Sequence, residues 1–255
     1  MIRIALLLIG FITLTACSTA YTVSVSPSAE QTTRYLDGIP VVISELAESA
    51  VVLIPPAHAV EERGQLSVIA INRGVSPANF GTENIAMKSA DDAYVHVYSY
   101  AELLDEEKTR QAWAAVAAGL AAASNSMQAA NTGYSTSYGS YTGSTYGTYG
   151  GTPYSGTTYG SGYVTTYDPA KAQAAHALAN QQNISNLQDM QMTNTLNERR
   201  LQEILKTTTV FPGASHSGEV VFEVPKGTGE SKYVSVRISM GNDEHAFHVR
   251  LSPSQ

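Results

Sequence analysis

The side chains that could perform acid–base or nucleophilic chemistry are few and scattered along the chain. Ser215, His216 and Ser217 are adjacent and supply a nucleophile and a base, the pair on which serine hydrolases depend. They lack the G-x-S-x-G pattern that holds a nucleophile on a sharp strand-to-helix turn, and they precede a strand-like segment. We therefore expect polar residues of a turn here, and not a catalytic pair.

Histidines and carboxylates also fail to form a metal-binding pattern. His245 and His248 are three residues apart, so in a strand they face opposite sides of the sheet and are poorly placed to share one ion. His58, Glu61 and Glu62 follow two prolines, where an exposed loop is the simpler interpretation. The sequence thus predicts no metal, no cofactor and no catalytic residue, and we expect the protein not to be an enzyme.

The one cysteine closes a short apolar segment at the amino terminus. Arg3 gives a basic start, residues 4–14 are almost all apolar, and Leu14-Thr15-Ala16-Cys17 follows. A transmembrane helix needs about 20 apolar residues, so this run is too short to remain as a membrane span. The pattern resembles the lipobox of bacterial lipoproteins, in which a peptidase cuts before the cysteine and the thiol receives a diacylglycerol. The resemblance implies a signal peptide over residues 1–16 and fatty acyl chains, such as palmitate, on Cys17.

The residue after the cysteine bears on location. Ser18 stands there, whereas in enterobacterial lipoproteins an Asp at this position retains the protein at the inner membrane. The resemblance therefore implies a lipid anchor in the outer membrane, on its periplasmic face or at the cell surface. A lipidated Cys17 leaves no thiol for a disulfide, so stability must come from packing.

Charge is low and unevenly distributed. Charged residues make up 15% of the chain, below the roughly 25% of an ordinary globular domain. The net charge is −7, and without a basic patch the chain is not expected to bind nucleic acid. No Asp, Glu, Lys or Arg occurs in residues 111–167.

Short segments that alternate apolar and polar residues flank a long central region. Such alternation is typical of strands with one buried face, and Pro55-Pro56, Arg73-Gly74 and Asp91-Asp92 supply turns. About eight or nine short strands at this spacing predict a mainly β fold, an antiparallel sandwich. The expected strands are 21–25, 51–54, 65–71, 85–87, 94–98, 220–224, 233–238 and 247–251.

Two patterns resemble immunoglobulin-like domains that are common in bacterial lipoproteins. Residues 211–213 read Phe-Pro-Gly and residues 217–225 read Ser-Gly-Glu-Val-Val-Phe-Glu-Val-Pro, similar to the ending PG…SG-x-V-x-F-x-VP of such domains. Residues 66–74, followed by Pro77 and Phe80, resemble their V-x-V-x-N-x-s-x-x-P-x-x-F strand and turn. The resemblance implies an immunoglobulin-like β-sandwich. The family pattern is structural and implies no catalytic residues.

A region with helical periodicity interrupts the β-rich sequence. Residues 99–102 form an S-x-x-E capping box, and Trp113, Val116 and Leu120 share one stripe of the helix that follows. A second helix begins at Asp168-Pro169, an N-cap residue with proline after it. Both ends of the region return to β-rich sequence, so we expect a long antiparallel αα-hairpin.

The predicted organisation therefore has four parts. They are the signal peptide over 1–16, the first part of the β-sandwich over 17–99, the helical-hairpin insertion over 100–206, and the second part of the β-sandwich over 207–255.

The tip of the insertion, residues 132–167, is of low complexity. Apart from Pro153 and Val164 it contains only Gly, Tyr, Ser and Thr. Such a segment has no aliphatic core and much glycine, which predicts a disordered tip. Its tyrosines offer amphipathic contact surface, although a flexible connector fits the composition equally well. The candidate interaction residues are Trp113, Tyr138, Tyr141, Tyr146, Tyr149, Tyr154, Tyr159 and Tyr163.

These features predict a non-catalytic outer-membrane lipoprotein that acts as a scaffold or assembly module of the cell envelope. Its partners would be the membrane, through the lipid, and a second copy or an envelope protein that covers the alanine-rich helix faces and the tip. The alternative is a glycan- or peptidoglycan-binding accessory protein or enzyme with the tyrosine-rich segment as a mobile lid, because tyrosine rings can stack on sugars.

Overall fold

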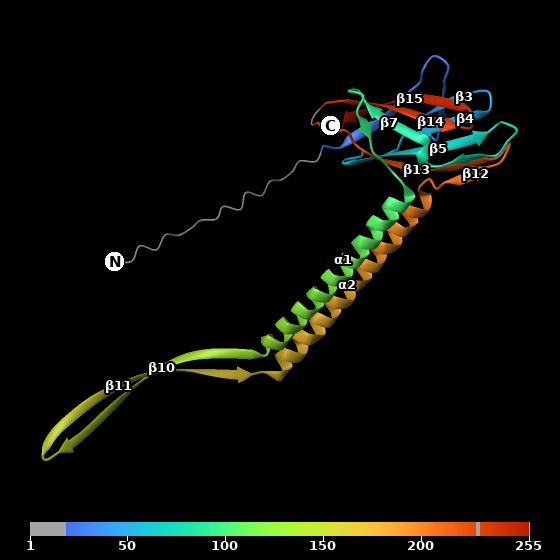
Figure 1. Cartoon of the computed structure of the whole chain (residues 1–255). Coiled ribbons are helices and arrows are strands. Elements are labelled where there is room, and N and C mark those ends of the chain that lie inside the picture. Colours follow the sequence, from blue (N-terminus) through green and yellow to red (C-terminus); the bar gives the residue numbers. More distant parts are fainter. Residues whose placement is uncertain (1–18, 228–229, 255) are drawn as a thin grey trace. The chain divides into compact units, whose positions relative to one another are not determined.

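The computed structural model describes residues 19–227 and 230–254 (Figure 1). They divide into two compact units, one formed by the residues up to Asp105 together with those from Arg200 onward, and one formed by Glu106–Arg199. We call these the β unit and the helical unit. The chain is mainly β, with antiparallel sheets and two helices, which confirms the fold class expected from the sequence at this level.

Two antiparallel sheets make up most of the β unit, with one short strand pair besides. The first sheet has the order β1-β15-β14-β7-β8, with β1 Tyr21–Ser26, β15 Asp243–Pro253, β14 Lys232–Met240, β7 Ile85–Ser89 and β8 Tyr94–Val95. The second has the order β2-β3-β4-β5-β13-β9, with β2 Thr32–Leu36, β3 Ile39–Glu45, β4 Ser49–Ile54, β5 Arg63–Asn72, β13 Ser215–Glu223 and β9 Val97–Tyr98. The pair is β12 Thr208–Val210 with β6 Ala78–Phe80, and the 3-10 helix Thr82–Asn84 follows β6.

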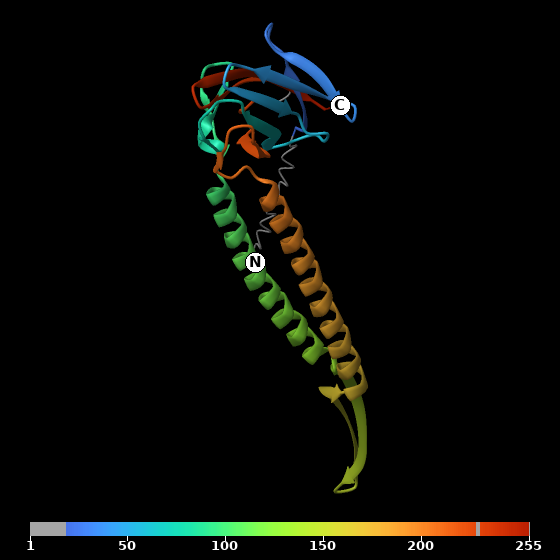
Figure 2. The ribbon, with the colours of Figure 1, turned by 90° about the vertical axis from the view of Figure 1, so that its right-hand side faces the viewer.

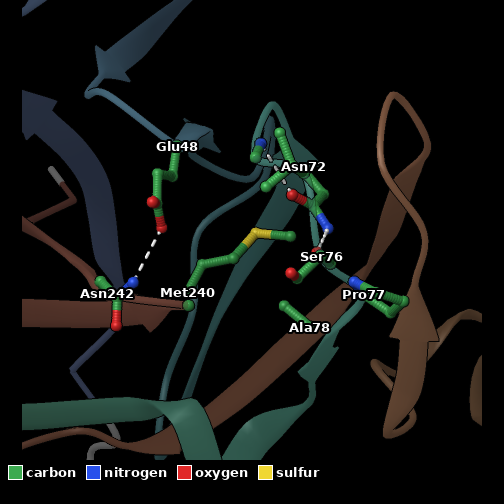
Figure 3. Close-up of a pocket in the computed structure, with 10 residues that line it drawn as sticks. Glu48, Asn72, Ser76, Pro77, Ala78, Met240 and Asn242 are labelled. Atoms are coloured by element: carbon green, nitrogen blue, oxygen red, sulfur yellow. Dashed lines mark hydrogen bonds between the residues drawn. The ribbon is translucent and has the colours of Figure 1, made fainter.

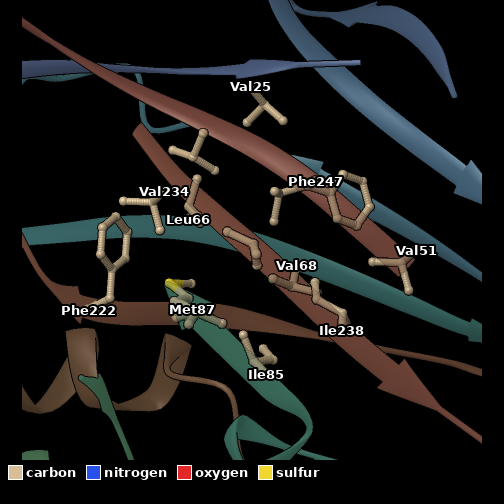
Figure 4. Close-up of a cluster of buried hydrophobic side chains, with 14 of the residues drawn as sticks. Val25, Val51, Leu66, Val68, Ile85, Met87, Phe222, Val234, Ile238 and Phe247 are labelled. Atoms are coloured by element: carbon tan, nitrogen blue, oxygen red, sulfur yellow. The ribbon is translucent and has the colours of Figure 1, made fainter. Parts of the chain in front are cut away.

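Alternation of side chains buries one face of each sheet in a single core (Figure 4). On β5, Leu66, Val68 and Ala70 are at most 1% exposed, so they form the inward face of that strand. Phe222 on β13 pairs with Gly64, and a Cβ on this glycine would lie 2.1 Å from the ring. Only glycine leaves room for the ring there, so the pair fixes how β13 packs on β5.

Asn72, at the end of β5, ties two turns to the core. Its side chain is nearly buried, and its Nδ2 donates to the carbonyls of Ser76, at 2.8 Å, and Val210, at 2.9 Å. Its Oδ1 accepts from the amide of Gly74 at 3.0 Å. Asn72 is the asparagine of the strand-and-turn pattern noted in the sequence, and its role is to satisfy backbone groups that turns leave unpaired.

The strand prediction was wrong in one segment and incomplete in others. Residues 94–98 form two short strands, because the chain changes sheet at His96, and β8 pairs with β7 whereas β9 pairs with β13. Strands β2, β3, β6 and β12 were not expected. The turn from β2 to β3 is Asp37-Gly38 with φ of 50° and 83°, a two-residue hairpin turn whose sequence signal was present.

The chain that returns from the second helix crosses closely over β13. The amide of Leu205 donates to the carbonyl of Glu219 at 2.8 Å. A Cβ on Gly218 would lie 2.5 Å from the Cα of Leu205, so this glycine permits the crossing. Beside it, Leu103, Ile204 and Val221 form a small second hydrophobic cluster.

The two helices begin at the residues that the sequence indicates. Helix α1 spans Tyr100–Thr132 and α2 spans Pro169–Glu203, and they lie side by side in both views (Figure 2). The capping box is confirmed, since the Ser99 amide donates to Glu102 Oε2 at 2.7 Å and the Glu102 amide donates to Ser99 Oγ at 3.2 Å. At α2, Asp168 Oδ1 accepts from the amides of residues 170 and 171, at 3.0 and 3.2 Å.

The expectation of a disordered tip was wrong. Strands β10 Tyr134–Tyr149 and β11 Thr152–Tyr167 pair antiparallel along their whole length, and we call this pair the ribbon. Gly150 and Gly151 join them with φ of 62° and 85°, the geometry that a two-residue hairpin turn requires. Tyrosine and threonine have high β-propensity, so a segment without a core still forms a ladder around this turn.

Candidate functional site

The ribbon separates its glycines from most of its tyrosines. Side chains alternate between the two faces of a strand, and residues directly opposite each other share a face. With Tyr134 opposite Tyr167, the glycine face holds all six glycines that lie within the strands and three tyrosines. The tyrosine face has no glycine and holds the other six tyrosines, which are Tyr134, Tyr138, Tyr146, Tyr159, Tyr163 and Tyr167.

Each face uses its aromatic rings differently. On the tyrosine face, rings of opposite residues meet, with centroids 5.0 Å apart for Tyr134 and Tyr167 and 6.2 Å apart for Tyr138 and Tyr163. On the glycine face, Tyr141 lies over Gly160 across the strand pair, and Tyr154 lies over Gly147 in the same way. An aromatic ring that covers a cross-strand glycine stabilises a strand that glycine would otherwise weaken.

The seven candidate tyrosines all lie on the ribbon and are all exposed. Exposed fractions run from 55% for Tyr154 to 86% for Tyr149. Four of them, Tyr138, Tyr146, Tyr159 and Tyr163, share the tyrosine face, whereas Tyr141, Tyr149 and Tyr154 lie on the glycine face. The structure thus brings the predicted residues into two ordered rows instead of a flexible tip.

Within the helical unit, a polar cluster around Glu107 joins the two helices. Glu107 is 9% exposed, and the donation from Arg110 lowers the pKa of its carboxyl group below the usual range. The carboxylate accepts from Arg110 Nε and Nη2 at 2.8 and 2.6 Å, Gln111 Nε2 at 2.9 Å and Asn197 Nδ2 at 3.1 Å. Arg110 Nη2 also donates to Asn194 Oδ1 at 2.7 Å.

Further along, the helices meet through small and amide side chains. Asn125 Nδ2 donates to Asn183 Oδ1 at 2.8 Å, and the buried residues there are Ala129, Ala172 and Ala179. Alanine allows close approach but buries little apolar area.

Trp113, the remaining candidate, lies on α1 and is 70% exposed. Its stripe partners Val116 and Leu120 are 52% and 68% exposed, so the stripe faces solvent. Exposed apolar side chains also occur on α2, namely Leu178, Ile184, Leu187, Met192 and Leu196. Exposed apolar side chains that gather into one patch are typical of an interaction site.

The expectation of a turn at Ser215, His216 and Ser217 was wrong, because these residues begin strand β13 and pair with β5. His216 Nε2 lies 2.8 Å from the carbonyl of Lys206, and since a carbonyl only accepts, this nitrogen carries the proton and donates. Nε2 therefore cannot act as the base for a neighbouring hydroxyl group. On β15, His245 is buried and His248 is exposed, as the alternation predicts, so these two histidines lie on opposite faces.

Sequence reasoning missed a buried polar chain around His245, which is 1% exposed. Ser49 Oγ donates to Asp243 Oδ2 at 2.8 Å, so it accepts from His245 Nε2, also at 2.8 Å. The other ring nitrogen, Nδ1, then accepts from Ser44 Oγ at 2.9 Å. Burial lowers the pKa of His245, against the opposing charge of Asp243.

The order hydroxyl, imidazole, hydroxyl, carboxylate is formally that of a relay to a nucleophile. Ser44 and Ser49 are 6% and 1% exposed and lie on β3 and β4. A substrate cannot reach either hydroxyl group, and we assign this chain of hydrogen bonds to linking the two sheets. The signal that could have found it is that position 245 shares the inward face of β15 with Phe247 and Val249.

A cavity of about 130 Å³ lies beside the Asn72 turn (Figure 3). Glu48 is its only charged lining residue, and Glu48 Oε2 accepts from Asn242 Nδ2 at 3.0 Å. Asn72, which also lines it, has its side chain occupied by backbone groups. The side chains of Glu48 and Asn72 are therefore both engaged by the turns that line the cavity.

Cys17 and the expected signal peptide lie outside the residues that the structure describes. None of the described helices is long and apolar enough to cross a membrane. Within residues 19–227 and 230–254, no three His, Cys, Asp or Glu side chains gather in a way that could hold a metal ion.

Comparison of the chain with models of protein families, with curated proteins and with solved structures found no match.

Proposed function

We propose that the protein is a non-catalytic, lipid-anchored lipoprotein of the outer membrane that serves as an assembly module of the cell envelope. In this proposal the two sheets form an immunoglobulin-like sandwich that acts as a scaffold, and the helices form an antiparallel hairpin that presents the ribbon to a partner. The partner is a second copy or an envelope protein. The observation that carries the proposal is the ordered, exposed and uncharged surface of the ribbon.

The architecture is supported by two sets of contacts. Buried side chains of both sheets belong to one cluster, as the two inner faces of a sandwich do. On the helices, residue 110 contacts residue 194 and residue 125 contacts residue 183. Contacts in this order are those of an antiparallel pair.

The anchor is supported by sequence alone. A basic residue, a short apolar run and Leu14-Thr15-Ala16-Cys17 occur in the order that the lipobox requires. A single lipid chain holds a protein only weakly at a membrane, whereas several acyl chains hold it stably. A diacylglycerol on Cys17 would place the whole chain at a membrane surface.

The interaction role is supported by what the molecule leaves exposed. Trp113, Val116 and Leu120 on α1 and the tyrosines of the ribbon are more than half exposed. Tyrosine and tryptophan are the residues that most often anchor protein interfaces, because their large rings bury much area with few rotatable bonds.

The experiment uses the full-length, membrane-anchored protein in three forms, namely wild type, Cys17→Ser, and a variant in which a short Gly-Ser linker replaces residues 134–167. We expect wild type to incorporate labelled fatty acid, to fractionate with the outer membrane and to capture itself or an envelope protein. Cys17→Ser should lose the label, and the linker variant should keep the label but lose the partner. Equal labelling of wild type and Cys17→Ser, or equal capture with and without the ribbon, would contradict the proposal.

A glycan- or peptidoglycan-binding accessory protein is the second candidate, favoured by the two rows of exposed tyrosine rings. Aromatic rings stack on the apolar faces of sugars. Sedimentation of the protein with isolated peptidoglycan separates the candidates, because the assembly module should stay in the supernatant and the glycan binder should sediment unless the ribbon is removed.

A further inference from the structure

We propose that the ribbon is a homodimerisation element, in which β10 of one copy pairs antiparallel with β10 of a second copy to make a four-stranded sheet. This inference rests on the proposed function and names its partner. It is drawn from the edges of the ribbon, its charge and the symmetry of its pairing.

The β10 edge has none of the features that keep a strand from pairing. The two strands form a sheet by themselves among the described residues, so the outward backbone groups of β10 meet no further strand there. Proteins usually protect such an edge with lysine, proline or a bulge. Residues 134–149 contain neither lysine nor proline, and their sixteen consecutive pairs with β11 contain no bulge. The β11 edge differs, because Pro153 removes one backbone donor.

The absence of charge on the ribbon favours a second copy as the partner of the β10 edge. No ionisable group other than tyrosine occurs in residues 111–167, so a charged partner finds no opposite charge on the ribbon. Another ribbon brings the same donors and acceptors and no repulsion. In an antiparallel pair the strand direction also gives two copies closed two-fold symmetry, which is the commonest arrangement of homo-oligomers.

The length of the strand is sufficient for a stable interface. At about 3.3 Å per residue, sixteen residues extend about 53 Å. A standard interface buries about 800 Å² on each partner. Spread over the sixteen residues of β10, this requires about 50 Å² per residue. Strand pairing also gives about one hydrogen bond per residue pair, more than the ten or so of a typical interface.

Symmetry also fixes which faces meet. In a two-fold antiparallel pair, residue i lies opposite residue j and j opposite i, so both must lie on the same face and differ by an even number. Even-numbered residues of β10, which include Tyr134, Tyr138 and Tyr146, belong to the tyrosine face. The tyrosine faces of two copies therefore join into one continuous surface. With near-complete overlap, the axis passes close to residue 141 or 142.

Cysteine cross-linking of the full-length, membrane-anchored protein tests this arrangement. Thr142→Cys places a thiol near the axis, within or close to the distance of about 7 Å between Cα atoms that a disulfide spans. Thr157→Cys is the matched control, since Thr157 is exposed on the same face of β11. In the dimer it lies at least three strand spacings, about 14 Å, from its equivalent. Wild type, whose one cysteine is Cys17, gives the background. We expect oxidation to join copies at least ten times more in Thr142→Cys than in Thr157→Cys.

Lysine at the same positions tests the pairing without oxidation. Thr142→Lys places like charges nearly opposite each other across the axis, whereas Thr157→Lys places them more than a Debye length apart. In sedimentation equilibrium of the detergent-solubilised protein, we expect Thr142→Lys to weaken dimerisation at least tenfold and Thr157→Lys to change it less than twofold. A monomeric wild type, or equal effects of the two lysines, would overturn the proposal.

The two proposals fail separately. A disulfide from Thr142→Cys to a different envelope protein, or equal cross-linking in the two cysteine variants, overturns the dimer and leaves the assembly function in place. Loss of the dimer is also independent of fatty-acid labelling at Cys17. Absence of that label contradicts the lipoprotein and leaves the β10 pairing as it is.

Discussion

The ring of Tyr141 lies across Gly160 on the opposite strand, so that a Cβ added to this glycine would lie 2.2 Å from the ring carbon Cζ. Gly156 lies on the same strand and the same face, and a Cβ there would meet nothing within 4 Å. The two glycines therefore form a matched pair of positions, one covered by a tyrosine and one open.

Alanine at these two positions should have different consequences. In a strand, alanine is favoured over glycine by about 0.5–1 kcal/mol, so Gly156→Ala should stabilise the ribbon by that amount. Gly160→Ala must displace the Tyr141 ring and lose its contact, which leaves the ribbon about 1 kcal/mol less stable than in Gly156→Ala. Hydrogen exchange of residues 134–167 in the full chain measures the difference. Equal protection in both variants would show that the ring does not stabilise the strand pair.

Gly218→Ala should destabilise the β unit by about 1–3 kcal/mol, because the added carbon meets the backbone of Leu205, which cannot rotate away. Ser217→Ala, an exposed neighbour on the same strand, is the control and should change stability by less than about 0.5 kcal/mol. Urea unfolding followed by circular dichroism provides both values. A Gly218→Ala variant as stable as its control would show that the crossing chain moves freely.

Asn72→Ala should cost about 2–3 kcal/mol of unfolding free energy, because it leaves the backbone groups of residues 74, 76 and 210 without their side-chain partner. Asn79→Ala is the matched control, since that exposed side chain accepts only from Thr209 Oγ1 in the contacts seen here. Urea unfolding again measures the change. Similar losses for both asparagines would argue against the special role of Asn72.

Stability should depend on pH through His245. The pKa of this histidine is lowered in the folded protein because burial disfavours the charged ring. The neutral ring therefore contributes its full stability above the unfolded pKa of about 6.5, and stability falls as the pH falls below that value. The slope of this contribution is at most about 1.4 kcal/mol per pH unit.

Comparison of variants isolates that histidine. Unfolding free energies at pH 7.5 and 5.5 should differ less in His245→Gln than in wild type, although the variant is less stable at both. His248→Gln, on the exposed face of the same strand, should keep the wild-type pH dependence. A slope that survives in His245→Gln would assign it to another group.

Trp113 is the only tryptophan of the chain and is 70% exposed. Its fluorescence should therefore resemble that of an indole in water while the protein is monomeric. It should shift to shorter wavelength when a partner covers α1. Trp113→Ala should leave the stability of the β unit unchanged, because the residue belongs to the helical unit. A blue-shifted emission at concentrations where the protein sediments as a monomer would contradict the exposed position.

Strands with one buried face could be predicted because each carries its own alternation, as residues 66–70 and 220–224 do. Two-residue turns carry an equally local signal in the sequence. Asp37-Gly38 and Gly150-Gly151 are such signals, and without them β2, β3 and the ribbon were not predicted. Composition alone did not predict the order of the ribbon. The separation of the glycines from six of the nine tyrosines becomes visible only once the register is known.

The alternation of β15 places His245 on the inward face, but it does not give the hydrogen-bond partners of this buried side chain. Its hydrogen bonds join Ser44 and Ser49 to a histidine about two hundred residues later, and no local pattern states which strands become neighbours. Likewise, nothing in the sequence around Asn72 indicates that its partner is the carbonyl of Val210. The sequence therefore predicts the buried faces of strands and the turns between them, whereas contacts between distant strands are known only from the fold.

The long interval without charge also decides how proteases meet this protein. Trypsin cleaves after lysine or arginine, and Arg110 and Lys171 are consecutive sites for it. Cleavage at these two sites releases residues 111–171 as one peptide, whether the ribbon is folded or not. Trypsin therefore does not report whether the ribbon is ordered. A protease that, like chymotrypsin, cleaves after aromatic residues finds many sites in the ribbon, because nine tyrosines lie along it. Comparison of its cleavage sites in the free protein and in the assembled protein shows which backbone positions a neighbouring chain protects.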